Sequence, residues 1–375
     1  MRRYTLRSLL IVLIVIAGVV AVAVPRPVDW KGFLEHQDSM RARLALETGE
    51  RIPLIGPAVD GNAWEDYGTA VLLRHTWRLG FIIGDRTEAR ESREHHIPLA
   101  IVECVQRGSR QRRAFDSRSA LRSIGQYEEP VISVGLNEAR ETLVRTTHVH
   151  CEAGDRAAAI RLTLATLQFG HDVASEWSLA TDGLVLLHDG LHLALELLQD
   201  EGLTREELRQ LLTALELLDR QFFSLADLVE RRSFDLCEAE LVQERSTPDR
   251  QRRRRLAHAR PYVEQFVAAI RMGESEPFEA SDVRLDTSTR SARDASVESP
   301  AFEMADNLPA WRRGALSHLR VAQAVARVRL GHQPGADHWP RDPATLGLLL
   351  VGNEGVIRGE PLPNSCRAEA RVKIR

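Results

Sequence analysis

The chain has 375 residues, of which 43% are hydrophobic, 27% are charged and 5% are aromatic. This composition is typical of a globular protein and excludes collagen-like, disulfide-scaffold and polytopic membrane proteins. Its 50 basic and 53 acidic residues leave a net charge of −3. No overall field would therefore attract a nucleic acid, and we expect no nucleic-acid partner. The length allows one large or two ordinary domains, which can bury a core without any cofactor.

Lysine is almost absent from the chain. Only Lys31 and Lys373 occur, one beside the hydrophobic N-terminal segment and the other close to the C-terminus. A phosphate-binding loop, a Ser-x-x-Lys pair or a pyridoxal Schiff base needs a lysine on a positioned internal element. The sequence therefore argues against these three chemistries.

Residues 9–24 form an uninterrupted apolar run that follows three arginines, at positions 2, 3 and 7. As a helix the run would be about 24 Å long, and Arg7 can extend it by snorkelling. We expect an uncleaved single-pass anchor in the lipid bilayer; the alternative is a signal peptide cleaved after Ala23. Either way, the arginines stay in the cytoplasm of a bacterial cell, and the rest is extracytoplasmic (periplasmic) at the inner membrane.

Four cysteines lie far apart and form no C-x-x-C pair, which argues against a zinc ribbon or a thioredoxin-like site. Export would permit two disulfides in any of three pairings. The alternative is that all four cysteines are small buried hydrophobic residues, because cysteine is among the most buried residue types. The sequence leaves both interpretations open for Cys104, Cys151, Cys237 and Cys366.

The first half of the exported part predicts helices at about residues 30–47 and 63–80, with Asn62 as the cap of the second. Residues 97–106 also favour a helix, with a short strand as the alternative. The segment EPVISVGL after residue 128 looks like a strand.

The central part predicts successive amphipathic helices. Gly154 and Asp155 supply a turn and an N-cap for a helix over residues 156–170. A second, leucine-rich helix from residue 178 would end with Gly202 as its C-cap. Thr204 and Glu207 form a capping box that opens the next helix.

The last third contains further helices at about residues 224–244 and 259–272, an arginine run at 250–255, and a polar span at 273–300 that resembles a linker. One more helix follows at 311–331, and two short apolar segments around residues 352–355 could form a hairpin. We therefore predict a mainly α protein with four parts: a membrane segment at 1–28, a helical bundle or irregular helical-hairpin array at 29–272, a linker at 273–300, and a C-terminal helix with a small β-hairpin at 301–375.

Two histidine clusters are candidate metal sites. In HVHCE, His148 and His150 would lie on one face of an extended strand, beside Cys151 and Glu152. In HDGLH, His188 and His192 lie four residues apart, on one side of a helix. The second pattern resembles the zinc-protease motif H-E-x-x-H, but Asp189 is shorter than the glutamate of that motif and no third ligand follows. Ordinary surface histidines would give the same patterns.

The layout resembles a loose group of bacterial envelope proteins with an N-terminal membrane segment. The resemblance rests on Asn62-Ala63 with Tyr67, on the Gly154-Asp155 turn before a leucine-rich helix, and on the segment 184–222. It implies an all-helical, tetratricopeptide-like exported domain and no particular activity.

Three functions are compatible with these features. The favoured one is a membrane-anchored scaffold that presents a helical surface to a protein partner. The alternatives are a metal-dependent hydrolase that uses His148, His150, His188 and His192 with zinc, where Glu152 or Asp189 is the base, and a carrier of a lipid or cell-wall ligand.

Overall fold

The computed structural model describes residues 30–46, 50–83, 88–114, 129–231 and 308–333, with shorter stretches between 233 and 271 and beyond 339. The predicted membrane segment, the arginine run and the polar span lie outside the described residues. None of the helices within the described ranges is long and apolar enough to cross a bilayer.

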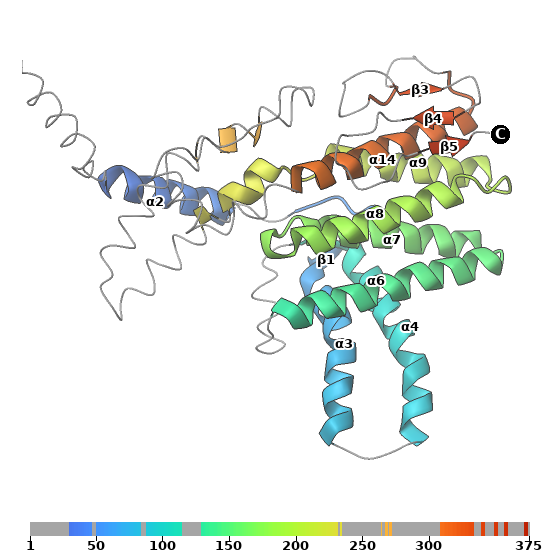
Figure 1. The fold of residues 1–375 in the computed structure, drawn as a ribbon, viewed down its shortest axis with the longest axis horizontal. Helices are drawn as coiled ribbons and strands as arrows, with labels where there is room; N and C mark the ends of the chain where they lie inside the picture. Colours follow the sequence, from blue (N-terminus) through green and yellow to red (C-terminus); the bar gives the residue numbers. More distant parts are fainter. Residues whose placement is uncertain are drawn as a thin grey trace, which may run out of the picture.

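The described chain is mainly helical, as predicted (Figure 1). Its helices are α2 (Trp30–Leu46), α3 (Ala63–Ile83), α4 (Glu88–Arg110), α6 (Glu129–Glu152), α7 (Arg156–Ala174), α8 (Ala180–Leu197), α9 (Arg205–Arg220) and α14 (Leu308–Arg329), with a single 3-10 turn, η1 (Trp177–Leu179). Short strands pair at two places: β1 (Val59–Asn62) runs parallel to β2 (Gln111–Arg113), and β3 (Leu350–Val351), β4 (Val356–Arg358) and β5 (Arg371–Lys373) form an antiparallel sheet beside α14. The predicted C-terminal hairpin is thus present as β3 and β4.

Helix α7 lies at the centre of the fold. It begins after Gly154, which has a φ of 73°, and at Asp155, whose side chain accepts a hydrogen bond of 3.0 Å from the backbone N–H of Ala158. Ala158, Ala159, Ile160 and every residue from Leu162 to Ala174 are buried, whereas Arg161 is exposed. The turn and cap predicted from Gly154 and Asp155 are confirmed, and from Leu162 onward α7 is covered on all sides.

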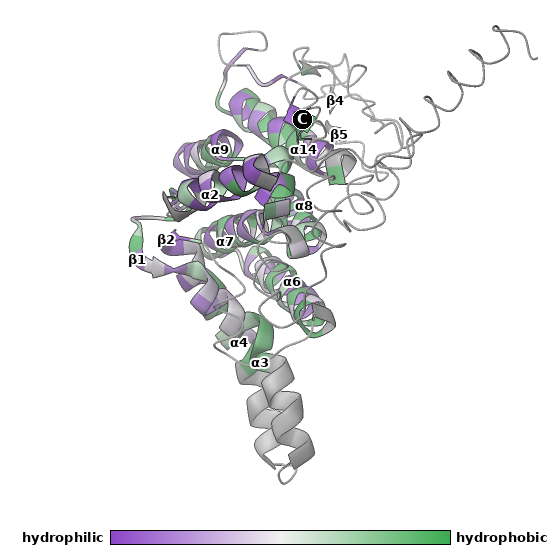
Figure 2. Ribbon diagram, turned by 90° about the vertical axis from the view of Figure 1, so that its left-hand side faces the viewer, coloured by the Kyte–Doolittle hydropathy of each residue, from purple (hydrophilic) through white to green (hydrophobic). Residues whose placement is uncertain are grey.

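Two apolar cores meet at α7. One contains residues of α7, α8, α9 and α14, and the other contains residues of α3, α4, α6 and α7. Figure 2 shows α3 and α4 beside α6, at the end of the bundle away from α9 and α14. The arrangement is a bundle, because α14 returns from the far end of the chain to pack on α8 and α9.

Helices α7 and α8 approach each other closely because glycines face the partner backbone. A Cβ on Gly170 of α7 would collide with the backbone of Leu187, and a Cβ on Gly183 of α8 would collide with the backbone of Ala174. Only glycine allows this separation, which fixes where α8 lies and which of its faces is turned away from α7.

The outer helices are held by caps and ion pairs. Helix α9 has the predicted capping box, in which Thr204 and Glu207 each bond the other's backbone N–H. Helix α14 is fixed at its C-terminal end by Arg329, which donates to the carbonyls of Leu198 and Asp200 at 2.9 and 2.8 Å. Arg320 pairs with Asp219 of α9 at 3.4 Å. These contacts set the register of α14 against α8 and α9.

Three local predictions are wrong. The segment EPVISVGL is the start of α6, because Ile132, Leu136 and Leu143 fall on one buried helical face. The HVHCE segment is the end of the same helix and not an extended strand. Helix α8 ends at Leu197 with its C-cap at Leu198, so Gly202 lies beyond the cap, in the turn that leads to α9.

A buried ion pair attaches the segment before β1 to α7. Arg51 lies 3.1 Å from Asp172, and their side chains are only 7% and 2% exposed. Asp172 also accepts hydrogen bonds from Tyr67 at 2.8 Å and from Gln168 at 3.0 Å. A buried carboxylate needs such a full set of partners, so we assign this network a structural role.

Candidate metal centre

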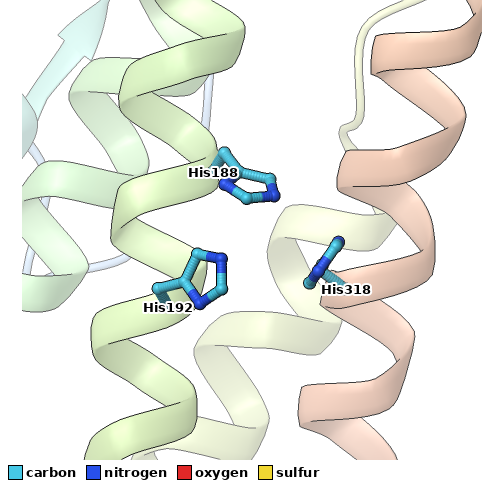
Figure 3. Close-up of side chains that lie close together, drawn as sticks. All are labelled: His188, His192 and His318. Carbon is cyan, nitrogen blue, oxygen red and sulfur yellow. The ribbon is translucent and has the colours of Figure 1, made fainter. Parts of the chain in front are cut away.

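Three histidines from two helices lie together between α8 and α14 (Figure 3). His188 and His192 are one helical turn apart on α8, on the side of the helix that faces α14. His318 comes from the facing side of α14. The sequence predicted the first two as metal ligands, and the third joins them only in the fold.

The rings are close enough to share one ion. One ligand nitrogen from each histidine lies within 4.8 Å of the other two. The ring centroids of His188 are 4.5 Å from His192 and 4.7 Å from His318, and those of His192 and His318 are 5.5 Å apart. This is the only such group of three or more histidine, cysteine or acidic residues among the described residues.

His318 is oriented for ligation. Its Nδ1 lies 2.8 Å from the carbonyl oxygen of Gly314, which can only accept, so Nδ1 carries the proton. The neutral ring then has its lone pair on Nε2, which is buried and has no hydrogen-bond partner. A metal-bound histidine is held in the same way, with one nitrogen on the ion and the other donating to a carbonyl.

The cluster favours neutral imidazoles. Burial, followed by the neighbouring His318 and His192, lowers the pKa of His188 from 6.5 to about 4. Burial also lowers the pKa of His318. Both rings are therefore unprotonated at neutral pH, which is the form that binds a metal ion.

The donor set fits zinc or a similar transition ion. A tetrahedral zinc with Zn–N bonds of about 2.0–2.1 Å would bring the nitrogens to about 3.3 Å from one another. The observed cluster must therefore contract slightly, and His192 is exposed and free of the core, so its ring can rotate toward the other two. Three imidazoles suit zinc, copper, nickel or iron better than calcium or magnesium, which prefer oxygen ligands.

The HVHCE histidines do not join this group. His148 points to Glu196 of α8, with Nε2 3.0 Å from the carboxylate, and His150 lies 3.8 Å from Asp155. Burial and the carboxylates of Glu196 and Asp200 raise the pKa of Cys151, which keeps its thiol protonated and disfavours metal binding. Cys104 and Cys151 both carry free thiols, while Cys237 and Cys366 lie outside the described residues.

The two carboxylates predicted as bases, Asp189 and Glu152, are not part of the histidine cluster. Asp189 is ion-paired with Arg140 of α6 at 3.5 Å, and burial raises its pKa. Glu152 is exposed at the end of α6. Neither carboxylate belongs to the histidine group.

Sequence reasoning missed His318 because it stands far along the chain from HDGLH. One local signal was present: His318 shares a helical face with Ala315 and Ala322, both of which are buried. A histidine on the apolar face of an amphipathic helix is either a satisfied core residue or a ligand, and only the fold shows its unpartnered nitrogen.

Comparisons of the chain with profiles of protein families, with curated proteins and with solved structures find no match.

Proposed function

We propose that the protein binds one transition-metal ion, with zinc as the principal candidate, through His188, His192 and His318. The observation that supports this most strongly is the orientation of His318: a buried ring whose Nδ1 is committed to Gly314 and whose Nε2 lacks any partner. An unpartnered buried acceptor costs about 1–3 kcal/mol, which a bound metal would remove. The low pKa of His188 adds to the case, because no proton competes for its ring at neutral pH.

The ion would also connect distant parts of the chain. His188 and His192 belong to α8, and His318 belongs to α14, so a bound metal would tie the C-terminal helix to the central bundle. Metal binding is then linked to the folded arrangement and stabilises it by mass action.

Hydrolysis has less support than binding. A zinc hydrolase needs a base near the metal-bound water, and Asp189 is engaged with Arg140 instead. The proposal therefore concerns metal binding by a helical protein.

We keep membrane attachment through residues 9–24, with the helical body on the extracytoplasmic side, as part of the proposal. Its support is the apolar run and the three arginines that precede it. A partner protein for the helical body stays a prediction of the sequence.

Metal content of the purified full chain tests the proposed function. After equilibration with zinc and removal of free ions, we expect about one zinc per chain, measured by mass spectrometry of the elements. His192→Ala is the most informative variant, because its exposed side chain can be removed without a cavity, and it should lose the metal. His150→Ala is the matched control and should keep it. Retention of zinc by His192→Ala, or its absence from the unaltered chain, would refute the proposal.

A further inference from the structure

The three histidines leave one coordination position of a bound ion unfilled. Zinc in proteins takes four ligands, and a site with three protein ligands holds water or a substrate in the fourth position. In the described part of the chain, no cysteine or carboxylate joins His188, His192 and His318. A structural zinc site, in contrast, has four protein ligands.

The cluster borders the solvent at His192. His318 is 3% exposed and closes the inner side of the cluster, whereas His192 is an exposed residue on the outer side. Figure 3 shows the three rings surrounding a common point between α8 and α14. A small molecule would therefore approach the ion past His192.

The positive charge of a metal ion bound by three neutral histidines favours an anion as the fourth ligand. Three neutral imidazoles contribute no negative charge, so a divalent ion would retain its full charge of +2. Asp189, the acidic residue next to His188 in the chain, interacts electrostatically with His192, but it is paired with Arg140 on α6 and supplies no ligand. In a partly buried site this uncompensated charge attracts an anion far more strongly than it would in water.

From these three observations, we propose that the metal ion held by His188, His192 and His318 binds a small exchangeable anion in its fourth position, where the anion replaces a bound water molecule. This inference rests on the proposed metal binding. It adds the ligand class: small monovalent anions, such as azide, acetate or a substrate carboxylate.

Cobalt(II) is the appropriate probe, because its visible absorption reports the coordination number and the exchange of a ligand, whereas zinc does not absorb visible light. The full chain, purified in detergent and loaded with cobalt, is titrated with sodium azide, and sodium perchlorate at the same concentration serves as a non-coordinating control. We expect the visible bands to shift with a saturable dependence on azide, and to stay unchanged with perchlorate. The cobalt content should be the same before and after the titration.

The outcomes separate the two proposals. If the chain gives no cobalt absorption, or if His192→Ala gives the same absorption, metal binding by these histidines is refuted. If the absorption depends on His192 but azide leaves it unchanged, metal binding stands and the exchangeable position is refuted, because a fourth side chain must then close the site. Loss of cobalt on addition of azide would equally count against an anion bound to the ion.

Discussion

The chemistry of the candidate centre depends on the burial of single side chains. His188 and His192 are one turn apart on the same helix, yet His188 is partly buried and His192 is exposed. The pKa of His188 is lowered to about 4, first by burial and then by its two histidine neighbours. The same packing that makes this ring a good ligand makes its protonation costly.

This pKa shift predicts a pH-dependent stability. Between about pH 4 and 6.5, the unfolded chain binds a proton at His188 that the folded chain does not, so the metal-free protein loses stability as the pH falls through this range. For His188 alone, the loss from pH 7 to 5 is about 2 kcal/mol. The free energy of unfolding, measured by urea titration at several pH values in the presence of a chelator, tests this prediction.

The control for this prediction is His188→Gln, which keeps a polar side chain of similar length and removes the titration. Its free energy of unfolding should change less with pH than that of the unaltered chain. His150→Gln, at a partly exposed position outside the cluster, should behave like the unaltered chain. Identical pH profiles for all three proteins would show that His188 is not responsible.

At the scale of elements, the position of α8 is set by its contact with α7. Gly170 and Gly183 bring the two helix backbones together, and His188 and His192 are then carried on the outer side of α8, toward α14. Gly190, between the two histidines, faces Leu167 of α7, and a Cβ added at this position would lie 3.0–3.2 Å from atoms of Leu167. Gly190 thus places the helical turn that carries the histidine pair directly on α7.

Adding a methyl group where the backbones of α7 and α8 meet should therefore destabilise the protein. Gly170→Ala would push the Leu187 backbone away, and we expect a loss of about 1–3 kcal/mol in the free energy of unfolding. Gly314→Ala is the matched control, because no atom beyond its own turn of helix lies within 4 Å of the added Cβ, and alanine should gain up to about 1 kcal/mol from helix propensity. Denaturant midpoints of the two variants measure the difference, and equal stability would contradict the close contact.

Over the whole molecule, the features that were predicted correctly from the sequence are those set by residues close together in the chain. The Asp155 cap of α7 and the Thr204–Glu207 box of α9 are set by a few neighbouring residues, and both are confirmed. The β-branched residues at the start of α6 suggested a strand, but burial of Ile132 and Leu136 on one helical face outweighs that preference.

The candidate centre shows where local reasoning stops. The spacing of His188 and His192 predicted a shared helical side, and the fold confirms this geometry. His318 could not be assigned, because its neighbourhood depends on how α14 packs on α8 and α9. That packing rests on contacts between segments far apart in the chain, such as Arg329 with the carbonyls of Leu198 and Asp200.

Membrane attachment is a property of the whole chain and can be tested apart from the metal. If residues 9–24 anchor the protein, the full chain should stay in the membrane fraction after alkaline carbonate extraction, whereas a chain that begins at residue 29 should be released. Replacing Val15 and Val19 by arginine should also release it, because two charges in the apolar run make insertion unfavourable by several kcal/mol. The mass of the purified full chain distinguishes the two sequence predictions: an anchor leaves residues 1–28 in place, and a signal peptide is removed after Ala23. Recovery of an uncleaved chain in the soluble fraction would refute both.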